Sequence, residues 1–224
     1  MNHSSSFGGY EATRVLVPGL YFATLLLFLF WSGLAPHLSS AALDGFPLIL
    51  LFVVVTIVSG LTLYAKETTK RRKAFLDNQP SLYLKNKARA MPALPALEDG
   101  DARRLYFFIL NNHVPATFHE KIFVFGTIYH IMTQIRRTSF WFAVSSTGFT
   151  LYQLSTGRTL PELQALVFFT VAVWLVYLLN VRYNKADRKM QENYQDQIYW
   201  LEMNNELVEN ILRRRSSSAS PQQQ

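Results

Sequence analysis

Two apolar segments in the C-terminal half, residues 139–154 and 163–181, constrain this chain more than any other feature. They are joined by the short turn 155–160. A bilayer core is crossed by roughly 20 helical residues at about 1.5 Å each, so residues 163–181 are long enough to span it. The first segment is also long enough if Thr138 and its neighbours lie among the headgroups. The pair predicts a transmembrane helical hairpin.

The N-terminal part of the chain carries a second apolar pair. Residues 15–34 end near Trp31, an aromatic side chain typical of a membrane interface. The loop that follows contains no Lys or Arg, and residues 46–64 form the next apolar run. Half of all residues are apolar and they are clumped, which favours a membrane protein. We therefore predict a first transmembrane hairpin over 15–64, preceded by a disordered, Ser- and Gly-rich tail over 1–14.

The basic residues indicate an orientation. Residues 66–138 hold 13 Lys and Arg and residues 182–224 hold 7, together 20 of the 22 in the chain. Because cytoplasmic loops are enriched in Lys and Arg, the N-terminus, the C-terminus and the segment 65–138 are predicted to be cytosolic. The net charge of +7 is divided among sites beside apolar segments, so it does not indicate a nucleic-acid-binding domain.

The cytosolic segment 65–138 is predicted to be helical. Pro80, Pro92 and Pro95 interrupt its first half, which is too short to bury a large core alone. A short helix over 104–110 should end at Asn111–His113, and Pro115 should open an amphipathic helix over 115–135. That helix leads directly into the third span, an arrangement typical of an interfacial or bundle-stem element.

Residues 182–215, after the fourth span, contain neither of the two common helix-breaking residues, glycine and proline. No Gly or Pro lies between Pro161 and Arg215, which predicts one helix from the span through 182–215, followed by a disordered tail over 216–224. The sequence thus predicts an all-α, polytopic membrane protein with four transmembrane helices in two hairpins, a cytosolic helical middle segment and a long C-terminal cytosolic helix.

The C-terminal helix also carries a short heptad seam, which predicts a coiled coil and a homo-oligomer. Its members are Tyr194, Ile198, Leu201, Asn205, Val208 and Leu212. Asn205 occupies an a-type position, where a buried amide fixes register and strand number. The alternative is that this apolar side packs on the chain's own neighbours, such as the helix that begins at Pro115.

The third span carries a stripe of small and polar residues at helical spacing: Ser139, Ala143, Ser146, Thr150 and Gln153. Such a stripe is typical of the close-packing face of a helix bundle, where small side chains let backbones approach. It is also compatible with the lining of an aqueous path. An oligomer would allow both.

Six basic residues are candidates for contacts with lipid headgroups or another anionic ligand: Lys70, Arg71, Arg72, Lys73, Arg136 and Arg137. Topology and lipid anchoring also explain them without a specific ligand. Both interpretations stay open.

The sequence predicts no enzyme. The chain has no cysteine, which excludes disulfides and thiolate chemistry, and it has no phosphate-binding or nucleophile motif. His119 and His130 lie eleven residues apart, and a zinc-binding His-Glu-x-x-His motif would need a histidine where Phe123 stands. We predict no catalytic residue, no metal and no cofactor.

Three functions fit this pattern. The first is an oligomeric, pore-like or membrane-permeabilising effector, such as those of bacterial defence systems, in the inner membrane of a cell. The second is a non-catalytic anchor or scaffold that binds a cytosolic protein through 115–135 and 182–215. The third, an intramembrane enzyme acting on lipid, would have to depend on His119 or His130. In each case the lipid bilayer is a partner and nucleic acid is not.

Overall fold

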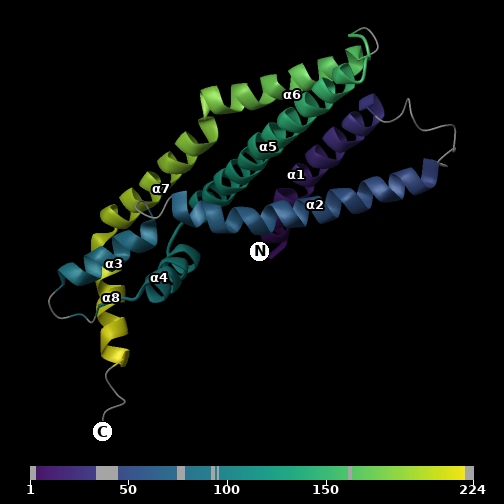
Figure 1. The fold of residues 1–224 in the computed structure, drawn as a ribbon. Helices are drawn as coiled ribbons and strands as arrows, with labels where there is room; N and C mark the ends of the chain where they lie inside the picture. The colour runs from purple at the N-terminus through teal and green to yellow at the C-terminus, as the bar shows by residue number, and fades with distance from the viewer. Residues whose placement is uncertain are drawn as a thin grey trace. The chain divides into compact units, whose positions relative to one another are not determined.

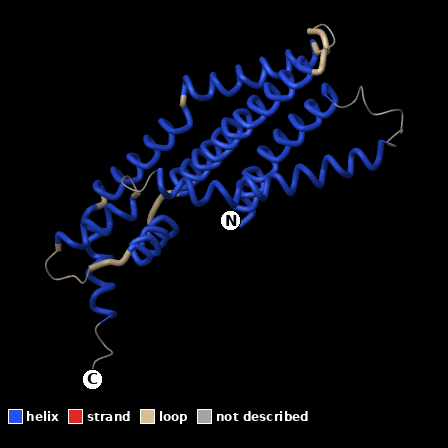
Figure 2. Tube along the Cα trace, viewed as in Figure 1, coloured by secondary structure: helices blue, strands red, loops and turns tan. Residues whose placement is uncertain are grey.

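In the computed structural model the described residues are 4–33, 45–74, 79–91, 94, 96–160 and 163–219. The side chains of 4–7, 32–33, 45–47, 67–74 and 216–219 lie outside the described part. Over these ranges the chain is helical apart from short turns, and no strand occurs in them (Figure 2). The prediction of an all-α chain is confirmed.

Eight helices follow one another through the described ranges (Figure 1). They are α1 Ser4–Gly33, α2 Gly45–Ala74, α3 Pro80–Ala90, α4 Asp99–Asn112, α5 Ala116–Ser155, α6 Gln164–Tyr183, α7 Lys185–Met203 and α8 Asn205–Ala219. The chain divides into two compact units. The first consists of Met1–Lys70 and Gly126–Ala186, and the second of Arg71–Phe125 and Asp187–Gln224.

The core of the first unit lies between α1, α5 and α6. Leu25, Phe142, Ala143 and Val173 form its buried cluster. The Phe22 and Phe142 rings meet edge to face with centroids 5.2 Å apart. Trp174 Nε1 donates a hydrogen bond to Thr147 Oγ1 at 3.0 Å, which joins α6 to α5. Small and aromatic side chains thus hold these three helices together.

Helices α1 and α2 approach each other at two glycines. A Cβ atom at Gly19 would lie well inside van der Waals contact with the carbonyl oxygen of Thr56. A Cβ at Gly60 would meet the carbonyl oxygen of Val15 in the same way. Since the obstructing atoms belong to the backbone, they cannot move aside as the end of a flexible side chain could. The two backbones therefore touch only because these positions carry no side chain.

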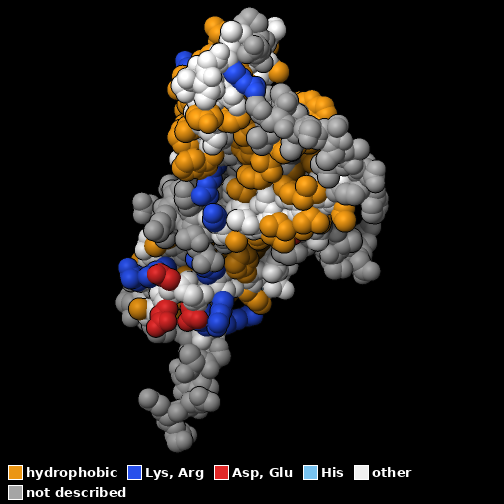
Figure 3. Space-filling model, turned by 45° about the vertical axis from the view of Figure 1, so that its right-hand side comes forward, with side chains coloured by type: hydrophobic (Ala, Val, Ile, Leu, Met, Phe, Trp, Pro, Cys, Tyr) orange, Lys and Arg blue, Asp and Glu red, His pale blue; other side chains and the backbone are white. Residues whose placement is uncertain are grey.

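Large apolar side chains cover the outside of the first unit. Ile49 is 64% exposed and Phe168 is 66% exposed. Figure 3 shows hydrophobic side chains gathered over one face of this unit. Among the described residues, three stretches are long and apolar enough to cross a membrane: Gly8–Trp31, Leu48–Lys66 and Gln164–Met203. This composition is consistent with a membrane location.

The second unit has the opposite arrangement, with an aliphatic core. Leu84 and Ala88 of α3 and Ile109 of α4 are buried beside the C-terminal helices. Leu201 of α7 and Val208 and Leu212 of α8 complete this core. The prediction that residues 65–138 cannot build a large core alone fits this result, because the core is shared with the C-terminal helices.

Hydrogen bonds and ion pairs surround that core. Tyr106 Oη donates to Gln197 Oε1 at 2.6 Å, and burial raises the pKa of Tyr106 above its ordinary value. Lys85 Nζ lies 2.5 Å from Asp99 Oδ1, and this hydrogen bond lowers the pKa of the Asp99 carboxyl. Arg215 pairs with Asp101 at 2.7 Å. Charged groups therefore lie at the surface of the second unit, where water solvates them.

Several predicted boundaries are wrong. Helix α1 begins at Ser4 rather than after a disordered tail over 1–14, so Pro18 lies inside it. Local contacts support the early turns, since Thr13 Oγ1 bonds Gly9 O at 2.8 Å and Arg14 pairs with Glu11 at 2.8 Å. Helix α2 continues past residue 64 to Ala74, and α8 continues past 215 to Ala219.

The prediction of a single C-terminal helix is also wrong. The chain breaks at Asn184, which adopts a left-handed conformation with φ of 39° and ends α6. A second break at Asn204 separates α7 from α8. Asparagine is the residue besides glycine that tolerates the left-handed region, so counting only Gly and Pro missed the first break.

The region around Pro115 agrees better with its prediction. Helix α4 ends at Asn112, and α5 runs from Ala116 through Ser155 without interruption. The expected helix over 104–110 is longer, Asp99–Asn112, and α3 was not predicted. Pro80 lies in the first turn of α3, where its missing N–H costs nothing.

Candidate functional site

A line of buried polar side chains follows one side of α5 within the first unit. Its members recur at spacings of three and four residues: Thr127, His130, Gln134 and Thr138, with Ser139 beside the last. All of them are buried. Burying a polar side chain costs free energy unless it forms hydrogen bonds. The stability of this line therefore depends on hydrogen-bond partners on the neighbouring helices.

Helix α1 supplies the first partners. Arg14 NH1 lies 2.8 Å from Glu11 Oε1, and Arg14 Nε donates to Thr127 Oγ1 at 3.1 Å. Glu11 and Arg14 both lie inside the apolar stretch Gly8–Trp31. A charge pair at this position is stable because the two groups neutralise each other and Arg14 bonds to α5.

Helix α2 supplies the second set. Tyr64 Oη donates to Glu11 Oε2 at 2.6 Å, and the Tyr64 and His130 rings lie 5.4 Å apart at their centroids. One turn further along α5, Gln134 Nε2 donates to the carbonyl oxygen of Leu63 at 2.8 Å. The cluster thus joins α1, α2 and α5 through Glu11, Tyr64 and Gln134.

The predicted stripe continues this line toward the C-terminal end of α5. Tyr21 Oη and Ser139 Oγ share a hydrogen bond of 2.8 Å, which connects α1 to the first stripe residue. Ser139, Ala143 and Ser146 are completely buried. Their surroundings are α1 and α6 of the same chain, as the cluster around Ala143 shows.

The remaining members of the stripe make local bonds. Ser146 Oγ donates to Ala143 O at 3.2 Å and Thr150 Oγ1 donates to Ser146 O at 2.8 Å. Gln153 is buried and Thr150 is half-buried. Within one chain this stripe is a helix-packing face. Whether it lines water in an assembly stays a prediction.

The residues of the predicted oligomerisation seam lie in the second unit. Leu201, Val208 and Leu212 are buried in that unit's own core with α3 and α4. This matches the alternative that the apolar side packs on its own chain, although on α3 and α4 rather than on the helix that begins at Pro115. Tyr194 and Ile198 are half-buried.

Asn205 differs from the other seam positions because it is exposed. Its Nδ2 donates to Glu209 Oε1 at 2.9 Å, and its Oδ1 accepts from Lys87. The hydrogen bond from Asn205 and the nearby Lys87 lower the pKa of the Glu209 carboxyl. Asn205 thus joins α8 to α3 within one chain. A role in fixing an oligomer is untested.

The predicted anion-binding residues fall into separate groups. Lys70, Arg71, Arg72 and Lys73 lie on α2, and their side chains are outside the described part. Arg136 NH1 donates to Asn184 Oδ1 at 3.1 Å and borders a pocket. Arg137 is half-buried, and its NH1 atom is buried with no hydrogen-bond partner among the described residues.

The histidines do not converge on a metal site in the described part of the chain, where no group of three possible metal ligands occurs. His119 Nε2 lies 3.2 Å from Asn111 Oδ1, and its ring is tilted against that of Phe123, with centroids 4.7 Å apart. His130 belongs to the cluster with Tyr64. These two histidines therefore have separate structural environments.

Sequence reasoning missed Glu11, Arg14, Tyr64 and Gln134. The first two were assigned to a disordered tail, and Tyr64 was treated as the end of a span. A signal for Gln134 was present, since the spacing 127, 130, 134, 138 extends the predicted stripe backward along the same helix face.

Comparison of the chain with protein-family models, with curated proteins and with solved structures finds no match. What can be stated is the class: an all-helical protein with three helices long and apolar enough, among its described residues, to cross a membrane.

Proposed function

We propose that this chain is a non-enzymatic, multi-pass protein of the cell membrane that anchors a cytosolic helical module. The module is the second unit, and its role is to bind a protein partner. The observation that carries this proposal is the intrachain core of Leu84, Ile109, Leu201 and Val208. This core supports a folded structure of the second unit itself. A module that presents a binding surface to a partner needs such a structure.

The proposed topology has four spans, with both termini and the middle segment in the cytosol. The distribution of Lys and Arg supports it. The proposed span that lies outside the three most apolar stretches is the third, residues 139–154 of α5, and its two faces support its inclusion. Trp141 and Leu151 are 59% and 62% exposed, whereas Ser139 and Ser146 on the other face are fully buried. A helix with an apolar outer face and small polar inner face suits a membrane bundle.

A second candidate is the pore-like effector, acting as a homo-oligomer. The observation in its favour is the polar line along α5, which runs from Thr127 through Gln153 and is interrupted at Phe142 and Ala143. In the described chain this line faces α1, α2 and α6. Conduction would require an assembly in which these helices separate from α5 and admit water.

Topology is tested first, and the absence of cysteine makes the test direct. Asn86→Cys and Thr156→Cys place single thiols in the middle segment and in the turn after α5. A membrane-impermeant maleimide applied to intact cells is expected to label Thr156→Cys and not Asn86→Cys. The reverse result would exclude the proposed orientation.

Liposomes then separate the two functions. Purified full-length chain is reconstituted with a potassium gradient, and ion flux is measured for the native chain, Thr150→Leu and the control Thr62→Leu on the exposed side of α2. An anchor is expected to leave flux at the level of protein-free liposomes. Flux that Thr150→Leu abolishes and Thr62→Leu preserves would replace the anchor proposal with the pore.

A positive test of the anchor uses a photo-crosslinking residue at Tyr199, which is 63% exposed on α7. In growing cells we expect one discrete adduct with another protein. The same residue at Leu50, on the apolar outside of α2, serves as control and should give no such adduct. An adduct between two copies of this chain would instead favour the oligomer.

A further inference from the structure

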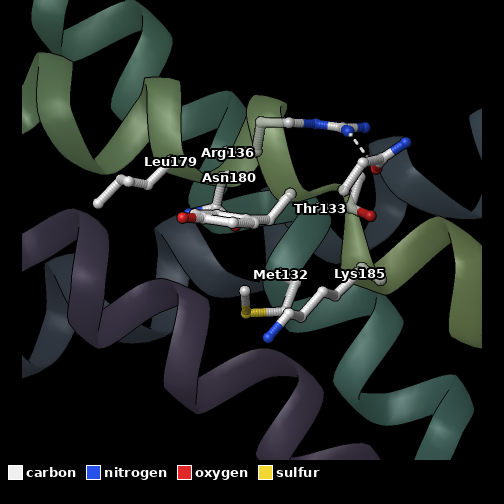
Figure 4. Close-up of a pocket in the computed structure, with 9 residues that line it drawn as sticks. Met132, Thr133, Arg136, Leu179, Asn180 and Lys185 are labelled. Carbon is white, nitrogen blue, oxygen red and sulfur yellow. Dashed lines mark hydrogen bonds between the residues drawn. The ribbon is translucent and has the colours of Figure 1, made fainter.

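A pocket of about 220 Å³ lies in the first unit where the end of α6 and the first turn of α7 meet α5. Figure 4 labels some of the residues that line it: Met132, Thr133 and Arg136 from α5, Leu179 and Asn180 from α6, and Lys185 from α7. The left-handed break at Asn184 creates this space, since an uninterrupted helix would carry the chain straight past α5.

The charge of the lining is one-sided. Arg136 and Lys185 are cations, and no carboxylate belongs to the residues that line the pocket. Arg136 donates to Asn184 Oδ1 at 3.1 Å, and this bond fixes the direction of the guanidinium. A planar guanidinium and a lysine ammonium are both groups suited to phosphate oxygens.

Two further features favour an anion. Helix α7 begins at Lys185, so the pocket contains a helix N-terminus, where unbonded N–H groups carry partial positive charge. In addition, Thr133 Oγ1 is buried and makes no hydrogen bond to any described residue. A hydroxyl in this state costs free energy unless a bound molecule completes its bonding.

The rest of the lining combines apolar side chains with the amides of Asn180 and Asn184. Met132 and Leu179 border the same pocket as Arg136, so the space joins a cationic part to a hydrophobic one. We propose that this pocket binds the phosphate group of an anionic molecule, carried either by a phospholipid headgroup or by a soluble phosphorylated compound. This assignment is independent of whether the chain anchors a partner or conducts ions.

The test measures binding to the full-length chain in uncharged detergent micelles. Three probes are titrated: short-chain phosphatidylglycerol, short-chain phosphatidylcholine and inorganic phosphate. We expect saturable binding of phosphatidylglycerol, weakened roughly fivefold by each of Arg136→Gln and Lys185→Gln. Inorganic phosphate that binds with the same dependence would identify a soluble ligand, whereas binding of phosphatidylglycerol alone would identify the lipid.

The matched control is Arg182→Gln, an exposed cation on α6 that does not line the pocket. It should leave the affinity unchanged. Equal weakening by Arg182→Gln and Lys185→Gln would show diffuse charge attraction and overturn the proposal, as would the absence of saturable binding to any anionic probe. If Arg136→Gln fails to fold because its bond to Asn184 is lost, the exposed Lys185 decides the result.

Discussion

The two units of this chain distribute polarity in opposite ways. In the first, Gln134, Ser139 and Ser146 are fully buried while Ile49 and Phe168 are mostly exposed. In the second, Leu84 and Leu201 are fully buried, and charged pairs lie at the surface (Figure 3). The side chains on the outside of a folded unit are those that its surroundings solvate best. The contrast is the one expected between a unit surrounded by lipid and a unit surrounded by water.

The forces that hold each unit together differ accordingly. Hydrophobic burial drives the second unit, because its core side chains leave water on folding. Such a force is weak between helices that already lie in lipid. The first unit instead relies on close backbone approach at Gly19 and Gly60 and on hydrogen bonds such as Tyr21 to Ser139. The same chain therefore needs different experiments for its two halves.

The largest predicted effect follows from truncating the core of the second unit. Leu201→Ala should lower the free energy of unfolding of this unit by about 2–5 kcal/mol, because Leu201 is completely buried. Hydrogen exchange at α4 amides in the full-length chain, held in micelles, measures the change. Leu50→Ala on the exposed side of α2 is the control, with an expected change within about 0.5 kcal/mol. Equal losses of unfolding free energy in Leu201→Ala and Leu50→Ala would contradict the difference drawn between the two units.

An intermediate effect is expected at the glycine crossing of the first unit. Gly19→Ala should destabilise the α1–α2 pair by about 1–3 kcal/mol, because its Cβ meets the backbone of Thr56. Unfolding by a denaturing detergent measures it. Gly148→Ala on α5, where nothing lies within 4 Å, should instead be neutral or stabilise by up to about 1 kcal/mol. A neutral Gly19→Ala would contradict the close approach.

The smallest effect concerns acid and is confined to the second unit. The pKa values of Asp99 and Glu209 lie below the ordinary values of 3.8 and 4.5, because of hydrogen bonds from Lys85 and from Asn205 respectively. A lowered carboxyl pKa adds stability above the ordinary value and loses it as the pH falls toward the folded-state value. We expect a slight loss of stability below about pH 4.5, since Asp99 is exposed and Glu209 is partly exposed.

Asp99→Asn should remove part of this acid dependence, and the neighbouring exposed Glu98→Gln provides the control. Unfolding of the second unit, followed between neutral and acid pH, gives the measurement. If Asp99→Asn and the native chain lose stability equally on acidification, the pair with Lys85 contributes nothing to it.

Much of the secondary structure was readable from local patterns. The break after Asn112 and the start of α5 followed from Asn, His and Pro signals, and the apolar stretches gave the candidate spans. The stripe from Ser139 was also found by spacing alone. These features depend on residues close together in the sequence, which is why a pattern of three or four residues reveals them.

The pairing of distant segments was not readable in this way. Leu201 and Val208 meet α3 and α4, about a hundred residues earlier in the chain, and nothing local distinguishes this core from a seam between copies. The same holds for Glu11, which reaches Tyr64 across 53 positions. The break at Asn184 was missed for another reason, since only Gly and Pro were counted as helix breakers, whereas asparagine can also adopt the left-handed conformation that ends a helix.

The crossing of α1 and α2 has a mechanical consequence. Where the two backbones are in contact, no side chain has to change rotamer when one helix rotates relative to the other. A translation of one helix along the other would instead bring each backbone against the side chains that flank the glycine of its partner. The contact at Gly19 and Gly60 therefore acts as a pivot: it permits α1 and α2 to change their crossing angle and resists translation of one along the other.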